Sequence, residues 1–279
     1  MTTAATATPL DAQAFSLAGH AFDSLATKYD EIFTESHIGR AQRDAVWRVL
    51  AKTFHPGDRI LELNCGTGED AFFLGRRGVS VLACDASAEM VAVSERRLLA
   101  ESPGTAIEFR QLPTEQIAHL GPTLSFDGVF SNFSGLNCVA DLQGTAAALS
   151  TSVRPGASLL LCLSTRYCLP EIVHFLWRGN LKKAFRRCKG HSAAMFGGVK
   201  IGVHYRTVRQ LRAVFSPHFR LVSYWGVGVA VPPSYCETWV RNHPTAFKLL
   251  RRLEPAMASI PVLRAIGDHI LLHFEKEPA

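Results

Sequence analysis

Two glycines and three acidic residues lie close together in the first third of the chain, in a spacing that could bind a nucleoside. An apolar run at residues 60–63, which contains Glu62, leads into the turn Asn64-Cys65-Gly66-Thr67-Gly68 and then into Glu69-Asp70. Glycine tolerates the positive φ angles of a tight turn and leaves room for a ligand beside the backbone. The pattern therefore predicts a strand, a turn that contacts a nucleoside, and the start of a helix.

The spacing of the two glycines and Ala71 also fits a dinucleotide fingerprint, so an enzyme that uses nicotinamide or flavin is the alternative. A dinucleotide lays its pyrophosphate on the helix N-terminus, where the carboxylates of Glu69 and Asp70 would repel it. S-adenosylmethionine carries no phosphate, and its ammonium and sulfonium groups suit an acidic rim formed by Glu62, Glu69 and Asp70. We therefore expect S-adenosylmethionine, although acids also favour a helix N-terminus without any ligand.

A second strand is expected at residues 79–84, and Asp85 follows it directly. An acid at this distance from the glycines can accept both ribose hydroxyls of a nucleoside. The alternative role of Asp85, capping the helix expected at residues 88–99, is better filled by Ser87.

Four segments together resemble the class I S-adenosylmethionine-dependent methyltransferases, in particular the small-molecule enzymes of ubiquinone and menaquinone biosynthesis. Phe22-Asp23-x-x-Ala26-x-x-Tyr29-Asp30 is similar to the family's N-terminal helix, and residues 61–68 are similar to its first motif. Residues 126–132 resemble its fourth strand, and residues 153–157 resemble the turn into its fifth. The resemblance covers roughly residues 20 to 165.

The resemblance implies that Glu62 and Gly66 hold the methionine end of the donor, that Gly68 lies beside the nucleoside, that Asp85 binds the ribose and that Tyr29 closes over the donor. The product would be S-adenosyl-L-homocysteine. The residues expected at the donor are Tyr29, Glu62, Asn64, Gly66, Gly68, Asp85, Ala86, Thr114, Glu115 and Asn132.

Two positions depart from the family pattern. Asn64 replaces the first glycine of the motif, and asparagine tolerates unusual backbone angles better than most residues. Pro113 stands where the family usually has an acid that receives the adenine amino group. Thr114 and Glu115 are the substitutes that we expect there.

Methyl transfer needs a general base only if the acceptor's nucleophile carries a proton. The candidates for this general base are His204, Tyr167 and His174. Residues 204–206 are expected to begin the helix that follows a lid. For each histidine, a purely structural role is the alternative. The segment after the fourth strand lacks the paired prolines of methyltransferases that act on nucleic-acid bases, which favours a small or lipid-like acceptor. The residues expected in the acceptor pocket are Phe133, Ser134, Asn137, Trp177 and Tyr205.

The alternation of strands and helices predicts an α/β fold, a Rossmann-like, doubly wound sheet of seven strands, and the family implies that the last strand is antiparallel. Residues 1–13 are expected to be a disordered tail, and residues 14–279 a single methyltransferase domain. Its core should comprise about 40–165, 204–226 and 268–276. Three segments are longer than the connections that the sheet requires: residues 14–39, 166–203 and 227–267. We expect them to be helical lid insertions that form the acceptor site.

The second insertion is strongly basic: residues 166–220 hold 12 arginines and lysines but one acid, Glu171. Apolar side chains alternate with these charges, as in an amphipathic helix pair broken at Gly179-Asn180. The pattern fits a helix on an anionic membrane, and equally a lid with a solvated outer face; nucleic acid is a weaker alternative. In both favoured cases Phe175, Leu176, Trp177 and Phe185 should face inward or into lipid, and Lys182, Lys183, Arg186 and Arg187 should face outward.

The seven cysteines include no C-x-x-C pair, which suits a reducing cytoplasm and predicts no metal site. An arsenic or thiol methyltransferase that uses Cys168, Cys188 and Cys236 is an alternative, as is a noncatalytic scaffold of the same fold. Neither a signal peptide nor a membrane span is expected, so the protein should be cytoplasmic, with an option for peripheral contact at the inner membrane face.

Overall fold

The computed structural model describes residues 19–102, 104–121 and 125–277, so the predicted disordered tail lies outside the described residues. Its centre is a seven-stranded sheet in the order β3-β2-β1-β4-β5-β9-β8. The strands are β1 Arg59–Leu63, β2 Ser80–Asp85, β3 Ile107–Gln111, β4 Phe126–Ser131, β5 Val153–Ser164, β8 Phe219–Val227 and β9 His269–Lys276. Strand β9 runs antiparallel to both β5 and β8, whereas β1 to β5 are mutually parallel. The expected doubly wound α/β sheet with an antiparallel last strand is confirmed.

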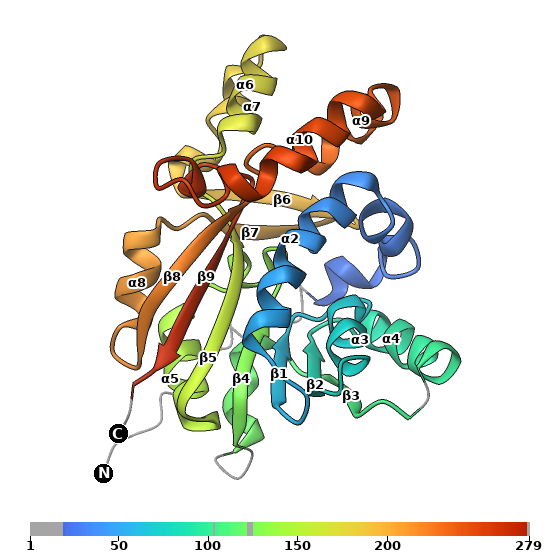
Figure 1. Ribbon diagram of the computed structural model, residues 1–279, viewed down its shortest axis with the longest axis vertical. Helices are drawn as coiled ribbons and strands as arrows, with labels where there is room; N and C mark the ends of the chain where they lie inside the picture. The colour runs from blue at the N-terminus through green and yellow to red at the C-terminus, as the bar shows by residue number, and fades with distance from the viewer. Residues whose placement is uncertain (1–18, 103, 122–124, 278–279) are drawn as a thin grey trace.

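Helices cover both faces of this sheet (Figure 1). One core cluster joins the sheet to α2 His37–Thr53, α3 Glu69–Gly75 and α4 Ala88–Glu101. The other joins it to α5 Leu142–Ser152, α8 Val208–Phe215 and the 3-10 turn η2 Thr114–Leu120. Burial on both faces of the sheet explains the continuous apolar run at residues 159–163 of β5.

Side-chain caps set the starts of several helices. The Ser87 hydroxyl accepts a hydrogen bond from the Met90 N–H, so Ser87 caps α4 as expected. Helix α8 begins only at Val208, because Thr207 and Gln210 form a reciprocal capping box. His204 instead ends a strand, so the prediction that residues 204–206 begin this helix was wrong.

Strand β5 begins at Val153, within the segment 153–157 that resembles the turn into the family's fifth strand. Phe126 of β4 pairs with Val153, and Gly128 of β4 pairs with Ser158. The extra residues of β5 between these two pairs form an irregularity in the strand register. The segment expected to form a turn at 153–157 is therefore a bulged beginning of the strand.

The three insertions gather above the carboxyl ends of the parallel strands (Figure 1). The second contains α6 Leu169–Trp177, α7 Leu181–Ala184, the turn η4 Arg187–Lys189 and a hairpin of β6 His191–Phe196 and β7 Val199–His204. The third contains η5 Ser234–Cys236, α9 Glu237–Asn242, α10 Pro244–Met257 and η6 Leu263–Ala265. The first ends in the π-helical turn η1 Asp30–Thr34. No helix among the described residues is long and apolar enough to cross a membrane.

The second insertion is held to the sheet by a buried ionic clasp. Glu171 accepts hydrogen bonds from Arg186 and Arg187, and Arg187 also donates to the Asp268 carboxylate at 2.8 Å. Gln42 of α2 donates to the same carboxylate at 3.1 Å. The expectation that Arg186 and Arg187 face outward was therefore wrong: Arg187 is buried and Arg186 is bound to Glu171.

Candidate functional site

The glycine turn follows β1 with three residues at positive φ. Asn64 and Gly66 both have φ of 55° and Gly68 has 80°, so asparagine does take the left-handed conformation of the glycine that it replaces. The Asn64 side chain accepts a hydrogen bond from Thr114 at 3.1 Å and lies against Gly135, where a Cβ would come within 2.3 Å of it. The turn is thus kept by a left-handed asparagine packed on a glycine of the next loop.

The two motif glycines have different surroundings. A Cβ at Gly66 would meet only Tyr29, at 3.9 Å, so space lies beside this residue. A Cβ at Gly68 would strike the Phe109 ring of β3 at 2.7 Å. Gly68 is therefore required by packing of the sheet as well as by the turn.

Glu62 carries an unusual buried carboxylate at the carboxyl end of β1. Its Oε2 atom is buried and has no hydrogen-bond partner among the described residues. Burial raises the pKa of Glu62 well above 4.5, and the nearby Asp70 raises it further. A buried acid without a partner is costly and binds a cationic group readily.

The other two acids of the expected rim are already neutralised. Asp70 accepts hydrogen bonds from Arg43 and Trp47 of α2, both at 2.6 Å, and from Asn132 at 2.9 Å. Glu69 forms an ion pair of 2.8 Å with Arg97 of α4. The expectation of an acidic rim formed by three free carboxylates was therefore wrong. Of the three acids, only Glu62 forms no ion pair with a described residue.

Asp85 lies at the end of β2, facing the glycine turn. Its two carboxylate oxygens accept hydrogen bonds from the backbone N–H groups of Gly66, at 2.8 Å, and Ser87, at 2.9 Å. Each oxygen keeps a further lone pair for a hydroxyl donor. Ala86 follows it and is half-buried, while Glu115 lies on η2 with a pKa raised by burial.

The N-terminal segment covers this turn. Asp23 accepts a hydrogen bond from the Ser87 hydroxyl at 2.5 Å, and Asp30 accepts one from Thr67 at 2.6 Å. Tyr29 is half-buried beside Gly66, and burial raises its pKa to about 12, so its phenol stays protonated. The structure therefore places residues 19–34 over the glycine turn, with Tyr29 beside Gly66.

The loop after β4 is strained and rich in aromatic contacts. Phe133 and Ser134 have φ of 44° and 73°, although neither is glycine. The Phe133 ring lies 4.9 Å from the Phe33 ring, 5.5 Å from the His269 ring and 4.9 Å from the Arg43 guanidinium, measured to centroids. This aromatic cluster adjoins Asn132 at the carboxyl edge of the sheet.

The remaining residues of the expected acceptor pocket are dispersed. Asn137 is buried and its amide donates to the backbone of His204 at 2.8 Å, so it ties loops together. Ser134 hydrogen-bonds Ser164 at 2.6 Å. Tyr205 packs under the Arg187 guanidinium, and Trp177 is 86% exposed on α6.

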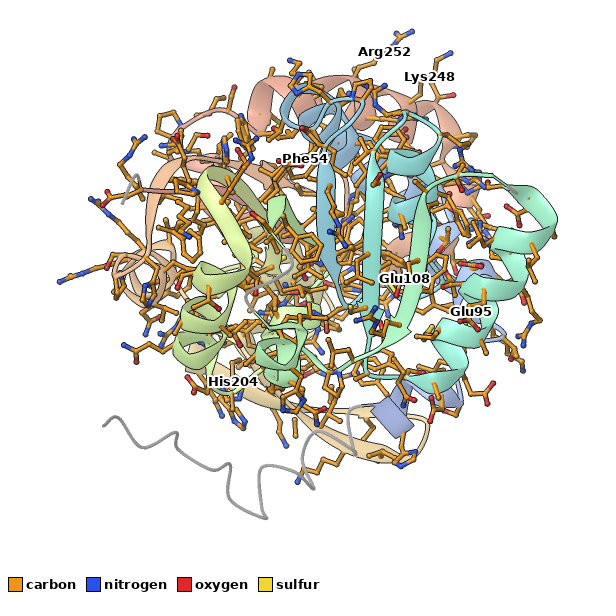
Figure 2. All side chains as sticks on the ribbon, turned by 90° about the horizontal axis from the view of Figure 1, so that it is seen from below. Phe54, Glu95, Glu108, His204, Lys248 and Arg252 are labelled. Carbon is orange, nitrogen blue, oxygen red and sulfur yellow. The ribbon has the colours of Figure 1, made fainter. Side chains whose placement is uncertain are left out.

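The three base candidates lie apart from the aromatic cluster. His204 pairs with His191 on the more exposed face of the β6–β7 hairpin, at the rim of the molecule in Figure 2, with centroids 5.1 Å apart. His174 contacts the Cys236 thiol at 3.5 Å, and Tyr167 is largely exposed. His269, which opens β9, was missed because only the folded sheet brings it beside Phe133.

Comparison with known proteins identifies the fold and its relatives. Residues 60–156 match the family model described as a methyltransferase domain. A demethylmenaquinone methyltransferase from Thermobifida fusca is 32% identical over 148 residues, which are 50% of this chain and 58% of that enzyme. The chain therefore spans a little over half the length of this relative.

Two solved structures share the fold over nearly the whole chain. The 4+2 cyclase SpnF superposes with a TM-score of 0.64 at 13% identity, covering 95% of this chain and 96% of its own. The complex of DhpI with S-adenosylhomocysteine gives 0.60 at 16% identity, covering 95% and 98%. Residues 60–156 thus match a methyltransferase domain, and the chain resembles the class I S-adenosylmethionine-dependent methyltransferases, among them those of menaquinone biosynthesis.

Proposed function

We propose that this protein transfers a methyl group from S-adenosylmethionine to a small organic acceptor. The observation that carries the proposal is the buried, unpartnered Glu62 carboxylate beside the open face of Gly66. The ammonium of the donor's methionine end is the complement that this carboxylate lacks. The pyrophosphate of a dinucleotide would instead add negative charge beside Glu62 and Asp85, which disfavours the nicotinamide alternative.

In this proposal each residue around the turn binds part of the donor. Asp85 accepts the ribose hydroxyls with its free lone pairs, and Tyr29 closes over the donor from the N-terminal segment. Thr114 and Glu115 flank the adenine. The donor's sulfonium supplies an activated methyl group, so the acceptor's nucleophile attacks the methyl carbon in line with the breaking C–S bond, and the protein acts chiefly by positioning.

The aromatic cluster supports a flat or apolar acceptor next to the transferred methyl. Phe33 and Phe133 offer ring faces, and the Arg43 guanidinium lies over the second ring. If the acceptor carries a proton on its nucleophile, we infer that His269 receives it. Burial lowers the pKa of His269, the adjacent Asp268 carboxylate raises it, and Arg187 lowers it. The net shift is downward, so the imidazole is neutral near pH 7 and able to accept a proton.

The thiol alternative has less support. Burial raises the pKa of both Cys168 and Cys236, which keeps these thiols protonated and weakens them as metal ligands. The described residues hold no group of three His, Cys, Asp or Glu side chains placed to bind a metal ion.

Calorimetry with S-adenosylhomocysteine and with NAD tests the proposal. The parent protein should bind the first and ignore the second, and Asp85→Ala should weaken binding by about 1.5–3 kcal/mol because a charged hydrogen-bond partner is lost. Asp85→Asn is the milder companion, since it retains the shape of a side chain that also supports Gly66 and Ser87. Binding of NAD without binding of S-adenosylhomocysteine would overturn the proposal.

Donor binding alone does not separate methyl transfer from a scaffold role or from another reaction on this fold, as the cyclase neighbour illustrates. The donor should therefore be incubated with pools of small and lipid-like acceptors, and the formation of S-adenosylhomocysteine followed together with a methylated product. Donor binding without turnover on any pool would favour the noncatalytic alternative.

A further inference from the structure

An apolar groove opens between α6 and α10, on the side of the insertions. Its volume is about 480 Å³, within the range of pockets that hold organic ligands. Along α6 it is lined by Leu169, Val173 and Trp177, which recur every four residues and so share one helix face. Across from them lie Leu250 and Met257 of α10.

Large apolar side chains continue from the groove onto its rims. Trp177 is 86% exposed and Val262 is 74% exposed, and Leu181, Leu249 and Leu253 are also exposed. Exposed apolar residues are ordinary when scattered, but a contiguous apolar surface usually marks an interaction site. We refer to the groove and these five side chains together as the apolar face.

The apolar face is flanked by basic residues. On a helix of 3.6 residues per turn, Leu253 falls beside the groove-lining Leu250 and Met257 of α10, and Leu249 lies next to Leu253. Arg252 and Lys248 follow Leu249 on the side of α10 that faces away from the groove. Figure 2 shows Lys248 and Arg252 extending away from the molecule. On the other rim, Lys182 and Lys183 of α7 are exposed.

The positive charge of this region is not balanced within it. Residues 166–264 contain 17 of the 30 arginines and lysines but three acids. Each acid is already engaged: Glu171 by two arginines, Glu237 by His37, and Glu254 by the backbone N–H groups of residues 229–231. Lys182, Lys183, Lys248 and Arg252 form no ion pair with any described residue.

We propose that the apolar face docks on an anionic lipid bilayer. Trp177, Leu249 and Leu253 would enter the boundary between headgroups and acyl chains, and Lys182, Lys183, Lys248 and Arg252 would contact the lipid phosphates. An apolar surface bordered by cationic side chains is what an interfacial helix requires. The proposal does not depend on methyl transfer, because it rests only on residues outside the donor turn.

Charge and polarity together favour a bilayer over other partners. A second copy would bring two unbalanced positive surfaces together, which opposes association. A nucleic acid would satisfy the charges but would leave Trp177 and the apolar groove in water. A bilayer satisfies both features at once.

The test is sedimentation of the full chain with vesicles of phosphatidylcholine alone or with phosphatidylglycerol added. We expect binding that requires phosphatidylglycerol and weakens as salt is raised. Lys248→Ala/Arg252→Ala should lower the partition coefficient about 30-fold, since each basic residue near such a surface is worth about fivefold. The matched control is Arg209→Ala/Arg212→Ala, which removes the same charge from exposed positions on α8 and should have little effect.

The apolar part has its own pair of variants. Trp177→Gln should reduce both binding and the quenching of fluorescence by lipids brominated in their acyl chains, with the groove-lining Trp239 left to report the remainder. Leu99→Gln, at a 79% exposed position on α4, should change neither. The proposal would be overturned if each control variant lost as much vesicle binding as the variant that it matches. So would failure of the parent to bind, or a dimer in solution that Trp177→Gln dissociates. Calorimetry with S-adenosylhomocysteine on every variant reports the donor site separately.

Discussion

At the scale of single residues, the donor binding that we propose would be coupled to the loss of a proton from Glu62. Because burial raises its pKa, the free protein holds this carboxyl partly protonated above 4.5, and the folded state loses stability as pH rises from 4.5 toward the raised value. A cationic ligand reverses the shift, so the proton leaves on binding. We expect the heat of S-adenosylhomocysteine binding to vary between buffers of different ionisation enthalpy, in the direction of proton release.

The matched variant is Glu62→Gln. It should bind roughly ten- to a hundred-fold more weakly, lose the buffer dependence, and be more stable than the parent at neutral pH when free of ligand, because no charge is buried. An unchanged buffer dependence in Glu62→Gln would assign the proton to another group, with Asp85 as the next candidate because burial raises its pKa as well.

His269 is the residue whose role the pH dependence of turnover can decide. Its lowered pKa means that the neutral base persists below the usual value of 6.5, so kcat/KM should fall only at more acidic pH. With an acceptor that carries a proton, His269→Gln should lower kcat by about 10²–10⁴ and abolish this acidic limb. His204→Gln, measured alongside, tests the candidate that lies on the hairpin; a large loss there with none in His269→Gln would return the role to His204.

At the scale of elements, the β6–β7 hairpin packs against the N-terminal segment that covers the glycine turn; the two together are called the roof. Phe196 stacks on Phe22 with ring centroids 5.1 Å apart, and a Cβ at Gly197 would lie 1.8 Å from the Ser24 hydroxyl oxygen. At Gly198 a Cβ would meet nothing within 4 Å. Both glycines have positive φ, so alanine strains the backbone at either position.

This pair gives a controlled test of the roof. Gly197→Ala should separate the hairpin from residues 21–24, speed the dissociation of S-adenosylhomocysteine and expose both segments to limited proteolysis. Gly198→Ala should leave the hairpin contact, the dissociation rate and the proteolysis unchanged, although it should lose stability as Gly197→Ala does. Ser24→Gly added to Gly197→Ala should partly restore slow dissociation, because it removes the clashing hydroxyl. Identical behaviour of the two alanine variants would assign the effect to backbone strain alone.

The elements that periodicity and caps encode locally were predictable, and those that depend on distant partners were not. The cap at Ser87 and the strand expected at 79–84 follow from neighbouring residues, and the structure has both. Asp70 was misread because its counter-ion, Arg43, comes from another helix, as Arg97 does for Glu69. The hairpin at 191–204 is an exception, because its signals are local: Val199, Ile201 and Val203 alternate with polar residues or glycine, and Gly197-Gly198 forms a two-residue hairpin turn. It was missed because the whole insertion was expected to be helical.

At the scale of the whole molecule, charge is divided unevenly. Residues 166–264 carry most of the arginines and lysines, whereas the remainder of the chain holds 21 of the 24 acids. Such a division gives the protein an electric dipole moment in addition to its net charge of +6. An anionic surface would therefore draw the apolar face toward itself before any contact forms.

The position of β9 in the sheet also orders events in time. Strand β8 pairs only with β9 among the described strands, and β9 separates it from β5. During synthesis, β8 therefore has no neighbour until residues 269–276 have left the ribosome, although β1 to β5 are already available to pair. Asp268, which receives Arg187 of the clasp, emerges directly before this strand. The ionic clasp that holds the second insertion to the sheet therefore cannot close until residue 268 has been synthesised, about 80 residues after Arg187.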